Sequence, residues 1–332
     1  NPTGKKQLQE ELKAGQNSEI RRFAAEQAEN GAQVLDVNVG MPGIDEKSVM
    51  LSTVLLLSSI TDLPLCLDSS SPEVLEAALR IYPGRALINS ISAEPEKMKK
   101  LLPVAAKYGA MFILLPIGAK GVPETSKERQ FLARKVIAAA EKYGYTNSDI
   151  VIDGLVMTVS SNQQAAKETL KLISWASHYG FNSVVGLSNV SFGLPERGLI
   201  NSTFLELARK NGLTMAIANP SADFSLISKD AERLLTGKDE GCRAWIGKYG
   251  VRGPALGEAS AGRPESKAAR TMTIGEAVVS GNRELMPSLI REELEKGKKP
   301  ADIVDNELVP AIAKVGELYE KKVYFLPQLI SS

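Results

Sequence analysis

Residues 183–189 decide the fold and read Ser183-Val184-Val185-Gly186-Leu187-Ser188-Asn189. The β-branched and apolar residues predict a buried strand, and the polar pair Ser188-Asn189 follows at its end. A loop with two glycines, a proline and Arg197 comes next, and an amphipathic helix follows the loop. Polar groups at the end of a buried strand cost free energy unless they bind something. Asn189 is therefore the first candidate for a role in chemistry.

The same order of strand, polar end, loop and helix recurs along the chain. Seven strands are predicted, each followed by a helix, at 34–39, 64–67, 86–88, 111–115, 150–152, 183–187 and 214–218. This alternation indicates an α/β fold of parallel strands joined by helical crossovers. A closed barrel needs eight strands, and residues 1–4 (Asn-Pro-Thr-Gly) are typical of the loop that follows a strand. We therefore predict a (β/α)8 TIM barrel over residues 1–240, with its first strand before Asn1.

An open, doubly wound sheet is the competing interpretation of this alternation. Such folds commonly carry Gly-x-Gly-x-x-Gly after an early strand, and no such motif occurs here.

The composition changes after residue 240. Glycine and proline are frequent over 241–264, which predicts a linker. From 265 to 332 the pattern is purely helical, and four helices with short connections predict an all-α four-helix bundle. We expect Pro310 to kink the third of these helices. We also expect the last helix to continue beyond Ser332, so that the chain is part of a longer protein.

Charge and cysteine content exclude several classes of protein. The 332 residues carry a net charge of +1, which gives no electrostatic reason to expect nucleic acid or a membrane surface as partner. Apolar runs are far too short to span a bilayer. Two cysteines, Cys66 and Cys242, and the single His178 argue against a disulfide framework and against a metal site. Without a visible signal peptide, we expect a cytoplasmic location.

The strand ends share one kind of side chain. In a TIM barrel the carboxyl ends of the strands form the active-site face. A carboxylate can accept two parallel N–H bonds from an amino-pyrimidinone edge, and an amide can donate and accept together. Asp and Asn also cap helices, so one position alone supports either role, whereas five or more favour a site for a planar heterocycle. The polar residues at these ends are Asn1, Asp36, Asn38, Asp68, Asn89, Asp153, Asn189 and Asn219.

These residues belong to motifs that resemble a known family. Asp68-Ser69-Ser70 and residues 186–191 (Gly-Leu-Ser-Asn-Val-Ser), with the other strand ends above, resemble the pterin-binding domain of cobalamin-dependent methionine synthase. Residues 325–328 (Phe-Leu-Pro-Gln) resemble a motif of the helical cap that covers cobalamin in that family. The resemblance extends over nearly the whole chain. The family's homocysteine domain and its Rossmann-like cobalamin domain have no counterpart in this sequence.

The resemblance implies a function and a set of site residues. The implied reaction is methyl transfer from 5-methyltetrahydrofolate to cob(I)alamin, carried out by a fragment of a methionine-forming enzyme. Cobalamin would be held mainly by a domain outside this chain, and a homocysteine domain would lie elsewhere in the full protein. Asn189 would be catalytic, near N5 of the pterin, and Phe325 would cover the corrin or pack in the bundle core. The pterin or folate would contact Asn1, Gly4, Lys5, Lys6, Asp68, Asn89, Asp153, Asn189, Arg197 and Asn219.

Three alternatives remain open at this point. A stand-alone folate:corrinoid methyltransferase shares the barrel, although a fused cap is not expected there. Dihydropteroate synthase shares the pterin site, but that family carries a late-strand Lys and an Arg-x-His, which residues 216–220 (Ala-Ile-Ala-Asn-Pro) do not provide. A non-catalytic corrinoid-binding module would use the barrel only as a scaffold, and the polar strand ends argue against it.

Overall fold

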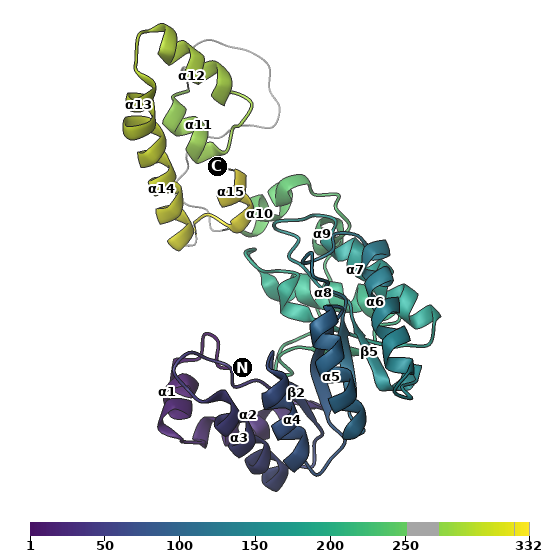
Figure 1. The fold of residues 1–332 in the computed structure, drawn as a ribbon. Helices are drawn as coiled ribbons and strands as arrows, with labels where there is room; N and C mark the ends of the chain where they lie inside the picture. The colour runs from purple at the N-terminus through teal and green to yellow at the C-terminus, as the bar shows by residue number, and fades with distance from the viewer. Residues whose placement is uncertain (251–271, 322, 332) are drawn as a thin grey trace. The chain divides into compact units, whose positions relative to one another are not determined.

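A computed structural model describes residues 1–250, 272–321 and 323–331 of the chain (Figure 1). Its sheet has seven strands in the order in which they occur along the chain, and every neighbouring pair is parallel. The strands form a nearly closed barrel, which confirms the predicted TIM-type fold. They are β1 (Leu35–Val37), β2 (Leu65–Asp68), β3 (Leu87–Ser92), β4 (Met111–Leu115), β5 (Ile150–Asp153), β6 (Asn182–Gly186) and β7 (Met215–Ile217).

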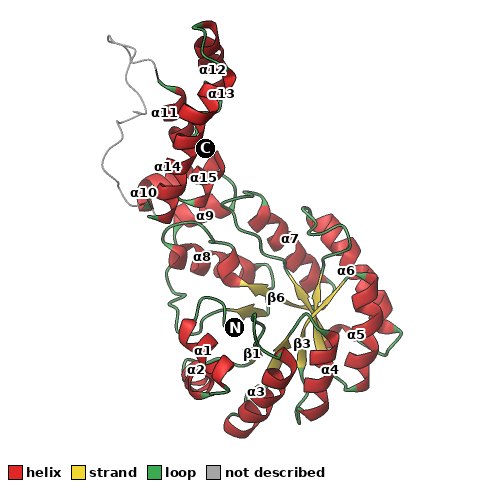
Figure 2. Ribbon diagram, turned by 60° about the vertical axis from the view of Figure 1, so that its left-hand side comes forward, coloured by secondary structure: helices red, strands yellow, loops and turns green. Residues whose placement is uncertain are grey.

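Helices surround the strands, which lie at the centre of the barrel in Figure 2. Local sequence explains where they begin and end. Ser71 caps α4 by accepting from Val74 N, with Pro72 in the first turn, and Thr125 with Glu128 forms a capping box on α6. The helices of the barrel are α1 (Lys6–Ala14), α2 (Ser18–Glu29), α3 (Glu46–Ile60), α4 (Pro72–Ile81), α5 (Pro95–Lys107), α6 (Ser126–Glu141), α7 (Ala165–His178) and α8 (Arg197–Lys210). Two further helices, α9 (Lys229–Leu235) and α10 (Arg243–Tyr249), follow along the chain.

The barrel has an outer core between strands and helices and an inner layer of side chains. Alternate residues of a strand point to opposite faces, so each strand from β2 to β6 gives one residue to the inner layer. That layer consists of Cys66, Leu87, Ile113, Val151 and Val184. Cys66 is therefore a buried core residue, as its place in an apolar strand predicts.

The C-terminal helices form a small bundle whose core includes Val278, Ala311 and Val315. Pro310 does not simply kink a helix, because a π-helical turn at Val304–Leu308 directly precedes it. Proline removes one N–H and its ring crowds the preceding turn, and a π turn is one way to accommodate this change of register. The described helices are α11 (Ile274–Ser280), α12 (Met286–Glu295), α13 (Pro300–Ile303), α14 (Val309–Glu320) and α15 (Leu326–Ser331).

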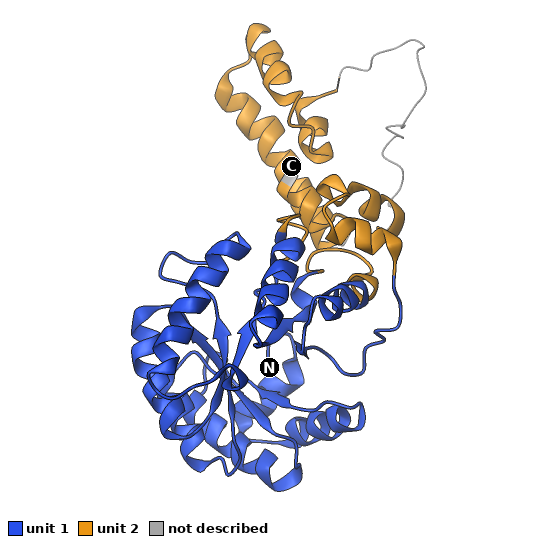
Figure 3. Ribbon diagram, turned by 90° about the vertical axis from the view of Figure 1, so that its right-hand side faces the viewer, with its two compact units in different colours: residues 1–157, 165–190, 201–227 blue, residues 158–164, 191–200, 228–332 orange. Residues whose placement is uncertain are grey.

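The chain divides into two compact units, coloured separately in Figure 3. The first contains residues 1–157, 165–190 and 201–227, and the second contains 158–164, 191–200 and 228–332. Within the predicted linker, Arg243–Tyr249 forms α10, and 251–264 lie outside the described residues. None of the helices in the described ranges has the length and apolar character that crossing a membrane requires.

Candidate functional site

Three neighbouring strands bring polar side chains together at the carboxyl edge of the barrel. Asn38 follows β1, and its Nδ2 donates to Oδ2 of Asp68, at the end of β2, over 2.9 Å. Asn89 of β3 donates from Nδ2 to Oδ1 of Asp36 over 3.2 Å. Asp68 and Asn89 are also register partners in the parallel sheet. The predicted site residues Asp68 and Asn89 therefore lie side by side in a hydrogen-bonded network.

Loop contacts fix this network in place. Ser69, directly after Asp68, donates from Oγ to Oε1 of Glu46 over 2.6 Å, and its backbone N donates to the Asn89 carbonyl over 3.2 Å. The Asn38 side chain accepts from Gly40 N over 3.1 Å. The Asn38 side chain is thus held by its own loop as well as by Asp68, and the backbone beside Asp68 is tied to that of Asn89, which favours a preformed site.

Burial sets the electrostatic character of Asp68. Loss of hydration raises the pKa of this carboxyl to about 6, and the charge of Asp36 adds to the rise, while the hydrogen bond from Asn38 opposes it. Asp68 is consequently ionised at neutral pH and protonated in mild acid.

Asp153 provides a second carboxyl at the end of β5. It is half-buried, and its Oδ1 accepts from the backbone N of Leu155 over 2.7 Å. Burial raises its pKa to about 6, against the hydrogen bond from Leu155 and the charge of Arg129. Asp153 and Asp68 are therefore two partly dehydrated carboxyls, and in its ionised form each can accept hydrogen bonds from N–H donors.

Asn189 lies in a 3₁₀ turn, Leu187–Asn189, that directly follows β6. The residue is exposed. Its amide nitrogen would be only 3.1 Å from a Cβ added to Gly186, so the side chain folds back over the end of its own strand. The absence of a side chain at Gly186 gives the Asn189 amide this position.

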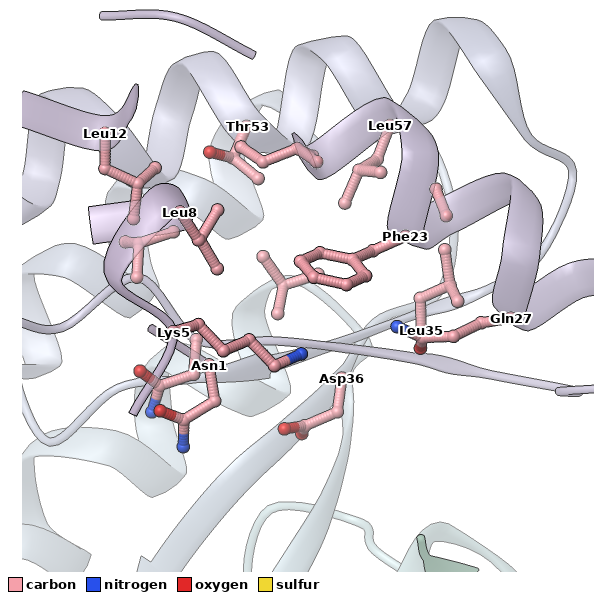
Figure 4. Close-up of a pocket in the computed structure, with 15 residues that line it drawn as sticks. Asn1, Lys5, Leu8, Leu12, Phe23, Gln27, Leu35, Asp36, Thr53 and Leu57 are labelled. Carbon is pink, nitrogen blue, oxygen red and sulfur yellow. The ribbon is translucent and has the colours of Figure 1, made fainter. Parts of the chain in front are cut away.

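The N-terminal segment reaches the same edge of the barrel. Asn1 and Lys5 line a cavity of about 80 Å³ together with Asp36 and Asn38 (Figure 4). Lys5 places its Nζ 3.9 Å from the centre of the Phe23 ring, a cation–π contact. Asn1 and Lys5 are therefore neighbours of the polar network. Gly4 has a left-handed φ of +74° in the turn before α1, and Lys6 is exposed on the first turn of that helix.

The remaining predicted residues have contacts of their own. Asn219, exposed after β7, accepts from Ser221 N over 3.2 Å in a local turn. It does not cap the next helix, because Ser228 is the N-cap of α9. Arg197 and Phe325 belong to the second unit. Arg197 donates from Nε to Ser191 Oγ over 3.0 Å. Phe325 is half-buried, and its backbone N donates to the Gln328 side chain over 2.8 Å.

Sequence reasoning missed Arg129, whose guanidinium is buried next to the β5 turn. A signal was present, because Arg129 stands on the buried stripe of α6 together with Ala133, Val136 and Ala140. A charged residue on the core-facing stripe of a helix is unusual enough to mark a site.

Residues 1–219 match the family described as "Pterin binding enzyme". The chain belongs to this family. Residues 273–332 of this pterin-binding enzyme match a second family, described as "B12 binding domain". The barrel and the helical bundle therefore correspond to two separately recognised domains.

Known relatives of this pterin-binding enzyme include two methyl-transferring proteins. It is 32% identical over 253 residues to the methylcorrinoid:tetrahydrofolate methyltransferase of Eubacterium limosum, covering 74% of this chain and 90% of that protein. It is 27% identical to the methionine synthase of Mycobacterium tuberculosis over 100% of this chain, which spans 30% of that protein.

Among solved structures, the pterin-binding enzyme is similar to dihydropteroate synthase of Xanthomonas albilineans with 4-aminobenzoic acid. The TM-score is 0.47 at 20% identity, over 69% of this chain and 84% of that one.

Proposed function

We propose that this pterin-binding enzyme transfers the methyl group of 5-methyltetrahydrofolate to a corrinoid. One observation carries the proposal: a pterin-binding barrel with two half-buried carboxyls at its carboxyl edge shares one chain with a B12-binding helical domain. The methyltransferase relatives support the same reaction class.

The carboxyls would recognise the pyrimidine side of the pterin. In this proposal Asp68 and Asp153 accept N–H donors from the ring, and Asn89 adds a group that can donate and accept. With pKa values of about 6, both carboxyls are ionised at neutral pH and accept charge-assisted hydrogen bonds. Asn1, Gly4, Lys5, Lys6, Arg197 and Asn219 remain proposed folate contacts, with the basic residues facing the anionic tail.

Asn189 would act where the carbon–nitrogen bond breaks. N5 of the folate is a tertiary amine and a poor leaving group, so it must gain a proton or a strong hydrogen bond as the methyl group departs. An amide has no proton of suitable acidity to give. The exposed Asn189 side chain can instead turn its carbonyl oxygen toward a protonated N5, with water delivering the proton.

The helical unit fits a corrinoid as an apolar cover. Val304, Val309 and Ile312 are 45%, 54% and 59% exposed, a grouping of apolar side chains on one stretch of helix. When bound, the reduced corrinoid supplies the nucleophile that accepts the methyl group. In the described part of the chain, no cluster of three His, Cys, Asp or Glu side chains could hold a metal ion. We infer from the exposed apolar side chains that these residues, with Phe325, cover the corrin. We also propose, as the resemblance implies, that a separate cobalamin-binding domain holds the cofactor.

Two members of this reaction class fit the chain. We assign it to the cobalamin-dependent methionine synthase type, with a homocysteine domain elsewhere, because the similarity to methionine synthase extends over 100% of this chain. A stand-alone methyltransferase is the second candidate, favoured by the higher identity of 32% to the Eubacterium limosum protein.

The test is an anaerobic reaction of the full chain with 5-methyltetrahydrofolate and free cob(I)alamin, followed by the loss of cob(I)alamin absorbance. We expect the absorbance to fall only when both protein and methylated folate are present, and unmethylated tetrahydrofolate is the control. Formation of dihydropteroate from a pterin diphosphate and 4-aminobenzoate, without methyl transfer, would instead assign the chain to dihydropteroate synthesis.

A further inference from the structure

Arg129 of α6 is a buried cation whose hydrogen-bond acceptors are neutral. Its residue is 1% exposed. Nη1 donates to the carbonyls of Gly154 and Leu155 over 3.2 and 3.0 Å and to Thr169 Oγ1 over 3.3 Å. Nε donates to the Pro123 carbonyl over 3.2 Å. Burying a charge is expensive unless it is paired or well hydrogen-bonded. Asp153, at the start of the same turn, is one of the carboxyls whose charge acts on Arg129, after that of Glu168.

The turn that Arg129 holds has an unusual backbone. Leu155 has a φ of +53°, which a branched side chain rarely adopts. Gly154 has no room for a side chain, since an added Cβ would lie 3.0 Å from both Thr169 and Val185. This backbone aims the Leu155 N–H at Asp153 Oδ1, 2.7 Å away. The carbonyls that Arg129 binds therefore belong to the turn that orients Asp153.

We propose that Arg129 is a positioning residue for Asp153: it fixes the Asp153–Leu155 turn through two carbonyls, and its charge favours the carboxylate form that receives the pterin. The inference rests on the proposed pterin binding. It explains why a guanidinium rather than an apolar side chain occupies the core-facing stripe of α6, because one planar group satisfies two adjacent carbonyls and also supplies a positive charge.

The charges around Asp153 are few, which makes the contribution of Arg129 measurable. Arg129 lowers the pKa of Asp153 against the larger effect of burial. From α6, Glu128 also acts on Arg129, and from α7 Glu168 does so, with Lys171 paired to Glu168. The flanking strands β4 and β6 consist of Met-Phe-Ile-Leu-Leu and Asn-Ser-Val-Val-Gly and contribute no titratable side chain.

The test is calorimetric titration of the full chain with 5-methyltetrahydrofolate between pH 5.5 and 8, for two variants that separate charge from geometry. Arg129→Lys keeps the positive charge but loses the planar guanidinium that donates to both carbonyls. Arg129→Gln keeps a hydrogen-bond donor but loses the charge. At pH 8 we expect both to weaken binding about tenfold or more. The pH midpoint of binding should move upward by about one unit in Arg129→Gln and stay within a few tenths of a unit in Arg129→Lys. Arg134→Gln, an exposed arginine on the same helix, should match wild type.

A double variant shows whether the effect passes through Asp153. In an Asp153→Asn background, Arg129→Lys should cost less than about twofold further affinity. The inference would be overturned if Arg129→Lys lost as much folate affinity in the Asp153→Asn background as in wild type. It would also be overturned if the Arg129 variants bound folate as well as Arg134→Gln does. Either result would leave the proposed function standing. No binding by wild type would overturn both. Failure of both Arg129 variants to fold, with Arg134→Gln folded, would assign Arg129 to stability alone and contradict the positioning role.

Discussion

Asp68→Asn should stabilise the ligand-free protein while it weakens folate binding. The folded protein raises the pKa of the Asp68 carboxyl from 3.8 to about 6, mainly through burial. The carboxylate form is therefore less favourable in the folded state than in the unfolded chain. Asparagine keeps the shape and can still accept the hydrogen bond from Asn38, but it carries no charge.

The magnitude follows from the pKa difference. A rise of about 2 units corresponds to roughly 3 kcal/mol for a fully buried group. Asp68 is half-buried, and partial hydration reduces the expected gain at pH 7.5 to about 1–2 kcal/mol. Because the folded pKa is raised, protonation contributes stability to wild type as the pH falls through about 6, and this contribution is complete only below about 4. The advantage of Asp68→Asn should accordingly shrink to about a third at pH 4.5.

Urea denaturation at pH 7.5 and 4.5 measures this difference directly, with the exposed Asp62→Asn as the matched control. Calorimetry on the same samples should show weaker binding of 5-methyltetrahydrofolate by Asp68→Asn at pH 7.5. The reasoning is refuted if Asp68→Asn is less stable than wild type at pH 7.5, or if its gain is the same at both pH values.

The remaining predictions concern Asn189 and two glycines. Asn189→Ala should lower the rate of methyl transfer to cob(I)alamin about a hundredfold and the folate affinity only a few-fold, since its contact strengthens as N5 becomes cationic; equal losses would make it a ground-state contact. In Gly186→Ala the new Cβ would lie 3.1 Å from the Asn189 amide nitrogen, so the amide should be displaced and the rate of methyl transfer should fall about tenfold. The matched control is Gly198→Ala, where the added Cβ meets open space. Equal rates in the two variants would contradict this prediction. Gly154→Ala should destabilise the protein by about 1–3 kcal/mol through contacts at 3.0 Å, as measured by urea denaturation, and an unchanged midpoint would disprove it.

The barrel was predictable from the sequence because its signals are local. A run such as Val184-Val185 predicts a buried strand without knowledge of its neighbours, and the structure contains all seven predicted strands. Boundaries were less accurate. β3 continues to Ser92, past its predicted end at Ile88, because a register shift between Asn89 and Ile91 lets the pairing with β4 resume. Asn89 therefore lies within a strand and not at its end.

The contacts of the site were not predictable, because they depend on the pairing of distant strands. Asn38 and Asp68 are 30 residues apart, and Asn89 and Asp36 are 53 apart. Their positions at or near the predicted ends of parallel strands place all four toward one edge of the barrel, but only the register decides which amide meets which carboxyl. Arg129 was missed for a related reason. It lies on α6, whereas the turn that it contacts begins 24 residues later, at the end of β5.

The most direct measurement of the central claim is the binding of 5-methyltetrahydrofolate to the full chain, compared with the Asp68→Asn/Asp153→Asn double variant. If the carboxyl edge of the barrel is the pterin site, wild type should bind one folate per chain at pH 7.5. The double variant should bind at least about a hundredfold more weakly, since two charge-assisted hydrogen-bond acceptors are lost. Equal affinity in the two proteins, or no binding by wild type, would contradict the claim.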